Sequence, residues 1–312
     1  MSEADERIKK KLRRELGVIS KYLDDKAVIE IMANPNGSVW VERMGSGMVH
    51  ECDITPSAVR SIINTLSAYL ATATNSVDPV LEGELPLDGS RFEGLIPPIV
   101  TAPSFTLRKR AMKVFTLDQY VDDEIMSQEQ RQVIDKGIED RKNIIISGGT
   151  GSGKTTLTNA IIAGITEIHP ADRIVTIEDT YELQCSAPNA VPMHSTAEVD
   201  MQRLLKITMR MRPDRIIVGE VRGAEALALL KAWNTGHPGG CATLHANSPT
   251  GALTRLHHLT AEGVATSSHI PELIAEAVNI VVQIAKTTDG RKITGMCEVH
   301  SYENNEYQFS ML

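Results

Sequence analysis

A glycine-rich segment that ends in a lysine and a threonine has the residue types needed to bind the phosphates of a nucleotide. Residues 148–155 read GGTGSGKT and match the pattern G-x-x-x-x-G-K-[ST] at every fixed position. Glycines let backbone N–H groups turn inward around a β-phosphate, and the N-terminus of a following helix adds positive potential. In such a loop Lys154 bridges the β- and γ-phosphates of ATP, and the Thr155 hydroxyl binds Mg²⁺. The candidate nucleotide-binding residues are Gly149, Thr150, Gly151, Ser152, Gly153, Lys154, Thr155 and Thr156.

Glu220 is a candidate to orient and activate the attacking water. It comes just after the apolar run 216–218, and ligands of open α/β sheets bind beyond the carboxyl ends of strands. Many P-loop enzymes place an aspartate that holds Mg²⁺ immediately before this glutamate. The residue there is Gly219. Mg²⁺ must therefore rely on Thr155 and on acids that act through water, unless Glu220 is simply a solvated glutamate.

Glu178 and Asp179 follow another apolar run, 173–177. If that strand neighbours the strand before the glycine-rich loop, both carboxylates reach the phosphates, and either could hold a metal-bound water. Ordinary strand-end acids are an equally good interpretation of the composition. We keep Glu178 as a candidate catalytic and metal-site residue.

Two histidines flank a short apolar run, 241–244. His237 lies in TGHPGG and His245 in TLHANS, so both have glycine or polar neighbours. Either could donate to a phosphate or couple the presence of phosphate to a loop position. A single histidine is more often structural, and no cysteine or third histidine is spaced to complete a metal site.

Arg91, Arg108 and Arg110 lie in the first half of the chain, far in sequence from the glycine-rich loop. A guanidinium group suits the charge that develops on a transferred γ-phosphate. The composition alone favours a surface role for each of them.

The elements that must position these residues differ between the two halves of the chain. From residue 126 onward, apolar runs at 143–147, 174–177, 216–218 and 241–244 alternate with helical segments. Strands without inside/outside alternation are typical of a parallel sheet covered on both faces, so we expect a doubly wound α/β domain.

The first half predicts a smaller α+β domain. It has a helix at 55–70 and β-prone pieces at 27–32, 39–43, 80–84, 91–96 and 105–109. The acidic stretch 116–125 lacks apolar periodicity, which indicates a linker. The expected division is therefore a domain at 1–115, the linker at 116–125 and an ATPase domain at 126–312.

Composition excludes several classes of protein. Lys+Arg total 32 against 40 Asp+Glu, for a net charge of −8, and aromatic residues make up 4%, which argues against direct nucleic-acid binding. The four cysteines form no CxxC pair, and neither a signal peptide nor an apolar stretch of about 20 residues is present. Residues 7–14, RIKKKLRR, predict an amphipathic helix with a basic face. That face is either simply solvated or attracted to an anionic membrane or an acidic partner.

Four sequence blocks resemble one family, the secretion traffic ATPases of type II and type IV secretion and of type IV pili. GGTGSGKTT, TIEDTYEL, RPDRIIVGEVRG and TGHPGGCATLHANS match its Walker A motif, Asp box, Walker B motif and His box in order and spacing. GSRFEGLIPP and FTLRKR are similar to the N-terminal domain of the type IV secretion branch. The tetracysteine insertion of general secretion ATPases and the AIRAGAL-like motif of pilus retraction ATPases are absent, which favours the conjugation branch.

The resemblance implies a RecA-like ATPase domain, a homo-hexameric ring and a nucleotide held between the two domains. It implies ATP and Mg²⁺ at Lys154 and Thr155, a catalytic role for Glu220 and an Asp-box role for Glu178. His237 and His245 become candidate sensors, and Arg91 and Arg108 fall where the family supplies phosphate-contacting arginines. It also implies a cytoplasmic protein, peripheral at the bacterial inner membrane, that contacts inner-membrane components of a type IV secretion or conjugation channel.

Other functions remain open at this point. A type IV pilus or DNA-translocating ring would use the same blocks, although the acidic balance disfavours contact with DNA. A P-loop small-molecule kinase would need a lid and an acceptor pocket, and the sequence identifies neither. A nucleotide-gated scaffold would bind ATP without turnover.

Overall fold

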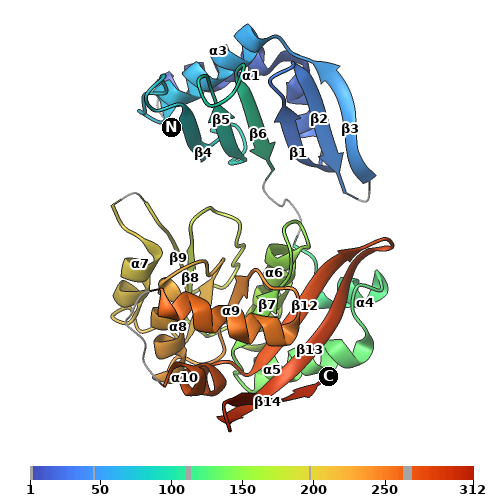
Figure 1. Ribbon diagram of the computed structural model, residues 1–312, viewed down its shortest axis with the longest axis vertical. Coiled ribbons are helices and arrows are strands. Elements are labelled where there is room, and N and C mark those ends of the chain that lie inside the picture. The colour runs from blue at the N-terminus through green and yellow to red at the C-terminus, as the bar shows by residue number, and fades with distance from the viewer. Residues whose placement is uncertain (1–2, 45, 110–113, 197, 263–268) are drawn as a thin grey trace. The chain divides into compact units, whose positions relative to one another are not determined.

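The structure is a computed structural model that describes residues 3–44, 46–109, 114–196, 198–262 and 269–312. The chain forms two compact units, residues 1–112 and residues 113–312, which are described separately (Figure 1). No helix among the described residues is long and apolar enough to cross a membrane.

The first unit is an antiparallel six-stranded sheet with helices on one face, in the order β3-β2-β1-β6-β5-β4 (Figure 1). Its helix α3 begins after Thr55, whose hydroxyl accepts from Ala58 N, with Pro56 in the first turn. Its helical elements are α1 (Glu3–Leu16), the 3₁₀ turn Gly17–Ile19, α2 (Ser20–Asp24) and α3 (Pro56–Tyr69); its strands are β1 (Val28–Ala33), β2 (Ser38–Arg43), β3 (Ser46–Asp53), β4 (Val80–Glu84), β5 (Arg91–Leu95) and β6 (Ser104–Arg108).

The core of this unit lies between the helices and the sheet. Leu12 and Leu16 of α1 and Ile62 of α3 pack against strand residues such as Ile31 and Leu107, and all are buried. The predicted amphipathic helix at residues 7–14 therefore exists, and its apolar side contributes to the core. The five β-prone pieces are confirmed as β1, β2, β4, β5 and β6, whereas β3 was not expected.

The second unit contains an eight-stranded sheet in the order β14-β13-β12-β7-β11-β10-β8-β9. Strands β12 to β9 are parallel, and β13 and β14 extend the sheet antiparallel beyond β12. The strands are β7 (Ile144–Ser147), β8 (Ile174–Glu178), β9 (Ala190–His194), β10 (Arg215–Val218), β11 (Cys241–Leu244), β12 (Ile280–Thr287), β13 (Gly290–Glu303) and β14 (Glu306–Met311). The helices are α4 (Leu117–Asp122), α5 (Gln128–Glu139), α6 (Lys154–Ile168), α7 (Met201–Thr208), α8 (Glu225–Asn234), α9 (Pro249–Ala261) and α10 (Ile270–Ala277).

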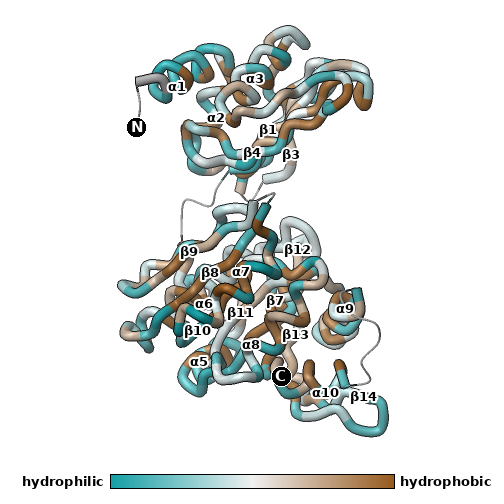
Figure 2. The backbone as a smooth tube through the Cα atoms, turned by 90° about the vertical axis from the view of Figure 1, so that its left-hand side faces the viewer, coloured by the Kyte–Doolittle hydropathy of each residue, from teal (hydrophilic) through white to brown (hydrophobic). Residues whose placement is uncertain are grey.

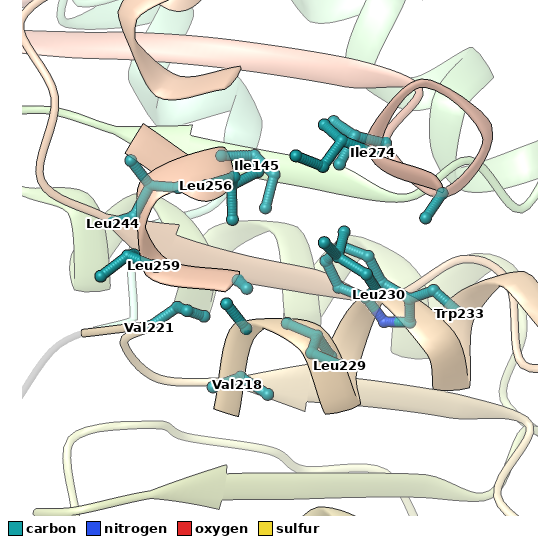
Figure 3. Close-up of a cluster of buried hydrophobic side chains, with 14 of the residues drawn as sticks. Ile145, Val218, Val221, Leu229, Leu230, Trp233, Leu244, Leu256, Leu259 and Ile274 are labelled. Atoms are coloured by element: carbon teal, nitrogen blue, oxygen red, sulfur yellow. The ribbon is translucent and has the colours of Figure 1, made fainter. Parts of the chain in front are cut away.

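Helices cover both faces of this sheet, as expected for a doubly wound α/β domain. Alternate residues of β7 show the two sides: Ile145 belongs to one core with α7 to α10, and Ile144 and Ile146 to another with α4 to α6. The strands of the parallel part of the sheet are mostly hydrophobic (Figure 2). Figure 3 shows the first core, where Leu230 and Trp233 of α8 pack near Ile145 and Ile274.

Two features of the second unit differ from the sequence-based expectations. The segment 116–125, expected as a linker, contains α4, which starts with a capping box between Thr116 and Gln119. Leu117 and Tyr120 are buried in the core of the second unit, so this segment is part of that unit. Strands β9, β12, β13 and β14 were also not among the expected apolar runs.

Candidate nucleotide-binding site

The glycine-rich loop connects β7 to α6, as its motif requires. Gly151 and Gly153 have φ values of +69° and +100°, a left-handed conformation that favours glycine. The Nζ of Lys154 lies 3.2 Å from the carbonyl oxygens of both Gly148 and Gly149, so the ammonium group is held against the loop. The loop therefore has the backbone conformation that a phosphate-binding loop requires.

Three predicted residues meet at the carboxyl edge of β7, β11 and β10. His245, which follows β11, places Nδ1 3.3 Å from Lys154 Nζ and Nε2 2.9 Å from Glu220 Oε1. Because Lys154 can only donate, Nδ1 is the acceptor and the ring proton is on Nε2. The ring N–H does not align with Oε1, which stays buried without a hydrogen-bond partner, so this contact is electrostatic.

The other oxygen of Glu220 is tied to an arginine that we did not single out from the sequence. Arg222 donates from Nη2 to Glu220 Oε2 at 2.6 Å and from Nη1 to Asp179 Oδ2 at 2.6 Å. Burial raises the pKa of Glu220, but the positive charges of Arg222 and Lys154 outweigh it and lower the pKa below its ordinary value. Glu220 is thus an ionised carboxylate with one free oxygen.

Burial also lowers the pKa of His245, and the positive charge of Lys154 lowers it further. The negative charge of Glu220 acts in the opposite direction without reversing the shift. A neutral imidazole between the lysine and the glutamate agrees with the tautomer inferred from the geometry.

Glu178 lies on β8, which is separated from β7 by β10 and β11, so the two strands are not neighbours as the sequence argument supposed. Its Oε2 accepts from the backbone N–H groups of Glu182 and Leu183 at 2.7 and 2.8 Å. A Cβ atom on Gly219 would lie 2.9 Å from Glu178 Cβ. Glu178 therefore fills the space that an aspartate at position 219 would need, which explains the glycine there.

His237 is not brought to the loop. It precedes β11, whereas His245 follows it, so the two histidines lie at opposite edges of the sheet. A strand of this length separates its ends by about 13 Å. His237 Nδ1 instead lies 2.8 Å from the carbonyl oxygen of Pro213, before β10. The structure therefore does not bring His237 and His245 together within this unit.

Arg91 and Arg108 are cross-strand neighbours in the first unit. They pair directly between β5 and β6. Glu30 of β1 is opposite Arg108 and Glu84 of β4 is opposite Arg91, so all four residues share one face. Neither guanidinium makes a hydrogen bond or ion pair among the described residues. Arg110 lies outside the described residues.

Comparison of the sequence with known proteins identifies its family. A family model described as "Type II/IV secretion system protein" matches residues 13–309. The chain belongs to this family. It is 50% identical over 303 residues to the conjugal transfer protein TrbB of Rhizobium radiobacter, a match that covers 97% of this chain and 93% of the relative.

Solved structures of secretion ATPases have a similar fold. The VirB11 ATPase of the Brucella suis type IV secretion system is 26% identical, with a TM-score of 0.50, and the match covers 95% of this chain and 97% of that one. The ATPase DotB of Legionella pneumophila, at 20% identity and a TM-score of 0.64, shares the fold, over 88% of this chain and 78% of that one. The chain is accordingly a nucleotide-binding ATPase of the type II/IV secretion family.

The described part of the secretion ATPase offers Mg²⁺ no cage of protein ligands. The described residues contain no group of three or more His, Cys, Asp or Glu side chains that could hold one. The loop nevertheless fits Mg²⁺, because Thr155 follows Lys154 in the first turn of α6 and supplies a hydroxyl beside the phosphate position. The remaining ligands would be phosphate oxygens and water.

Strands β12 and β13 bring two further residues to the loop, and neither was expected. Arg291 Nη2 lies 3.3 Å from the carbonyl oxygen of Gly151. Buried Gln283 accepts from the Ser147 hydroxyl and donates to Ala246 O at 3.1 Å, which joins the end of β7 to the segment that carries His245. The turn sequence at 287–290, TTDG, was the available signal for this hairpin.

Proposed function

We propose that this chain hydrolyses ATP to ADP and phosphate to power conjugative transfer through a type IV secretion system. The observation that carries the proposal is the contact of His245 with both Lys154 and Glu220 at the mouth of a phosphate-binding loop. The similarity to TrbB supports the conjugative system as the machine. Residues that bind phosphate and a residue that can activate water then belong to one site.

In the proposed reaction, the loop and Lys154 bind the β- and γ-phosphates. Lys154 exchanges its carbonyl contacts in the loop for phosphate oxygens, and this releases His245 from the ammonium group. Mg²⁺ at Thr155, with Glu178 and Glu220 acting through water, would neutralise charge on the transferred phosphate. The free Oε1 of Glu220 accepts a hydrogen bond from the attacking water, and its lowered pKa keeps it ionised for that task.

We further propose that the chain works as a homo-hexameric ring. Arg91 and Arg108 would then contact the phosphates, an assignment supported by their unpaired guanidinium groups. The basic side of α1 would contact an anionic membrane surface. Components of the conjugation channel at the cytoplasmic face of the inner membrane would be the partners.

Hydrolysis by single-residue variants tests the proposed site. Lys154→Ala should abolish phosphate release, because the loop loses the cation that contacts both phosphates. Glu220→Gln should still bind a fluorescent ATP analogue but should hydrolyse ATP at least about 100-fold more slowly. Lys231→Gln on α8 is the control and should match the wild type. Unchanged hydrolysis in Lys154→Ala would show that the site is assigned wrongly.

The identity of the product separates the proposed ATPase from the alternatives. An ATPase transfers the γ-phosphate of ATP to water and releases free phosphate, whereas a kinase transfers the γ-phosphate to an acceptor molecule. Salt-sensitive stimulation by DNA would instead indicate a DNA-translocating ring. Specific activity that rises with protein concentration to a plateau would support assembly into a ring.

A further inference from the structure

Arg222 joins two carboxylates that follow neighbouring strands. Glu220 follows β10 and Asp179 follows β8, and these strands pair in parallel with Val218 opposite Ile177. The guanidinium group reaches each carboxylate at 2.6 Å with a different nitrogen. Although 53% of the Arg222 side chain is exposed, both ends of the guanidinium are therefore occupied.

The backbone that carries Arg222 is fixed on both sides. Val221 is buried, and its N–H donates to Thr243 O at 2.8 Å. The N–H groups of Arg222 and Gly223 both donate to Glu225 Oε1, at 2.6 and 2.9 Å. Because the loop is held in this way, the guanidinium group approaches Glu220 from one defined direction.

The direction from which Arg222 approaches Glu220 matters because several charged groups lie at this edge of the sheet. The acids at the edge are Glu178, Asp179, Glu182 and Glu220, and the basic groups that face Glu220 are Lys154, Arg222 and His245. Arg222 occupies Oε2 of Glu220, so Oε1 is the oxygen beside His245. Without the guanidinium group, Glu220 and Asp179 would repel each other and nothing would select which oxygen faces the phosphate.

We propose that Arg222 is a positioning residue for hydrolysis: by bridging Glu220 to Asp179, it aims the free oxygen of Glu220 at the attacking water. This inference rests on the proposed ATPase function. Arg222 itself touches neither nucleotide nor water in this role. It acts through Glu220, so its loss should slow the chemical step while nucleotide binding is preserved.

Steady-state ATP hydrolysis by four variants of the full chain tests this role. Arg222→Gln should lower kcat about 10- to 100-fold, as for other partners that orient a reacting group, with KM for ATP within about twofold of the wild type. The kcat of Arg222→Lys should lie between those of the wild type and Arg222→Gln, because an ammonium group keeps the charge but lacks the planar pair of N–H donors that spans two carboxylates. Asp179→Asn should lower kcat less than Arg222→Gln. The double variant should be no slower than Arg222→Gln, because both changes break one bridge.

Arg210→Gln is the matched control, since Arg210 is an exposed arginine in the turn before the opposite edge of the sheet. Thermal unfolding of each variant excludes a general loss of structure, and Arg222→Lys keeps the test usable if Arg222→Gln does not fold. A wild-type chain that releases no phosphate would refute the proposed function itself. With an active wild type, three results overturn the positioning role alone. These are an Arg222→Gln rate equal to or above the wild-type rate, a loss confined to KM, or fully multiplicative effects in the double variant.

Discussion

The guanidinium group has different surroundings in the two units. The second unit holds Arg215 and Arg222, and the first holds Arg91 and Arg108. Arg215 has no exposed surface and donates to Asp172, to Gly239 O and to Ile138 O. In contrast, the guanidinium groups of Arg91 and Arg108 make no bond or ion pair among the described residues.

The difference separates arginines that maintain the second unit from arginines that are available to a ligand. A guanidinium group with its donors paired cannot turn to a phosphate without leaving buried acceptors unsatisfied. An unpaired guanidinium loses no protein contact when it binds an anion. We therefore expect changes at Arg215 to affect stability, and changes at Arg91 or Arg108 to affect hydrolysis without affecting stability.

The largest effect should follow from Arg215→Met. The change removes the donor of the buried carbonyl oxygen of Gly239 and the main partner of Asp172, so we expect the free energy of unfolding of the second unit to fall by about 3–5 kcal/mol. The two tryptophans, Trp40 and Trp233, lie one in each unit. In a Trp40→Phe background, Trp233 fluorescence during urea unfolding reports the second unit alone.

Arg210→Gln in the same background is the control for Arg215→Met. Arg210 is exposed, so its loss should change the free energy of unfolding by less than about 0.5 kcal/mol. If Arg215→Met cost less than about 1 kcal/mol, the buried arginine would not be the structural element that the comparison assumes.

Arg108→Gln should have the next largest effect, on hydrolysis alone. Loss of a hydrogen bond to a charged phosphate should slow phosphate release about 10- to 100-fold. Trp40 fluorescence in a Trp233→Phe background should show unchanged stability of the first unit. Arg91→Gln should behave in the same way if both arginines contact the nucleotide.

Arg14→Gln is the matched control, because Arg14 is exposed on α1, which covers the other face of the sheet. If Arg108→Gln lowered the stability of the first unit and left ATP hydrolysis unchanged, Arg108 would have a structural role like that of Arg215.

The Asp172 ion pair also predicts a pH dependence. Burial raises the pKa of Asp172, but its hydrogen bonds with Arg215 and Arg141 outweigh it and lower the pKa. A lowered pKa in the folded state means that the contribution to stability is present above the ordinary carboxyl pKa and is lost as pH falls through the folded value. Asp172→Asn should therefore destabilise the second unit at pH 7, and its difference from the wild type should shrink below about pH 4. A difference that stays constant down to acid pH would contradict the ion pair.

Local patterns were enough to predict the separate elements, because each depends on neighbours in sequence. Thr55 and Pro56 mark the start of α3, and the glycine-rich loop lies between a strand and a helix as expected. The partners of Arg222 could not be read in this way, since they depend on β8 and β10 being adjacent. His237 lies apart from His245 for a simpler reason: residues before and after one strand lie at opposite edges of the sheet.

The smallest effect should come from Arg13, whose pairing resembles that of Arg222 on paper. Arg13 donates to both oxygens of Asp24 at 3.1 Å, but the side chains of Arg13 and Asp24 are 51% and 61% exposed. Water competes for both groups, so Arg13→Gln should lower the free energy of unfolding of the first unit by less than about 1 kcal/mol. The difference in free energy of unfolding between the wild type and Arg13→Gln should shrink at about 1 M salt, where exposed charges are screened within a few ångströms.

Urea unfolding followed by Trp40 fluorescence in a Trp233→Phe background measures this change in the first unit. A loss above about 2 kcal/mol would mean that hydrogen-bond geometry alone sets the value of a guanidinium–carboxylate pair. A small, salt-sensitive loss beside the large one at Arg215 would show that burial and unsatisfied acceptors set it. The free arginines of the first sheet could then bind a phosphate strongly only where the bound nucleotide excludes water from them.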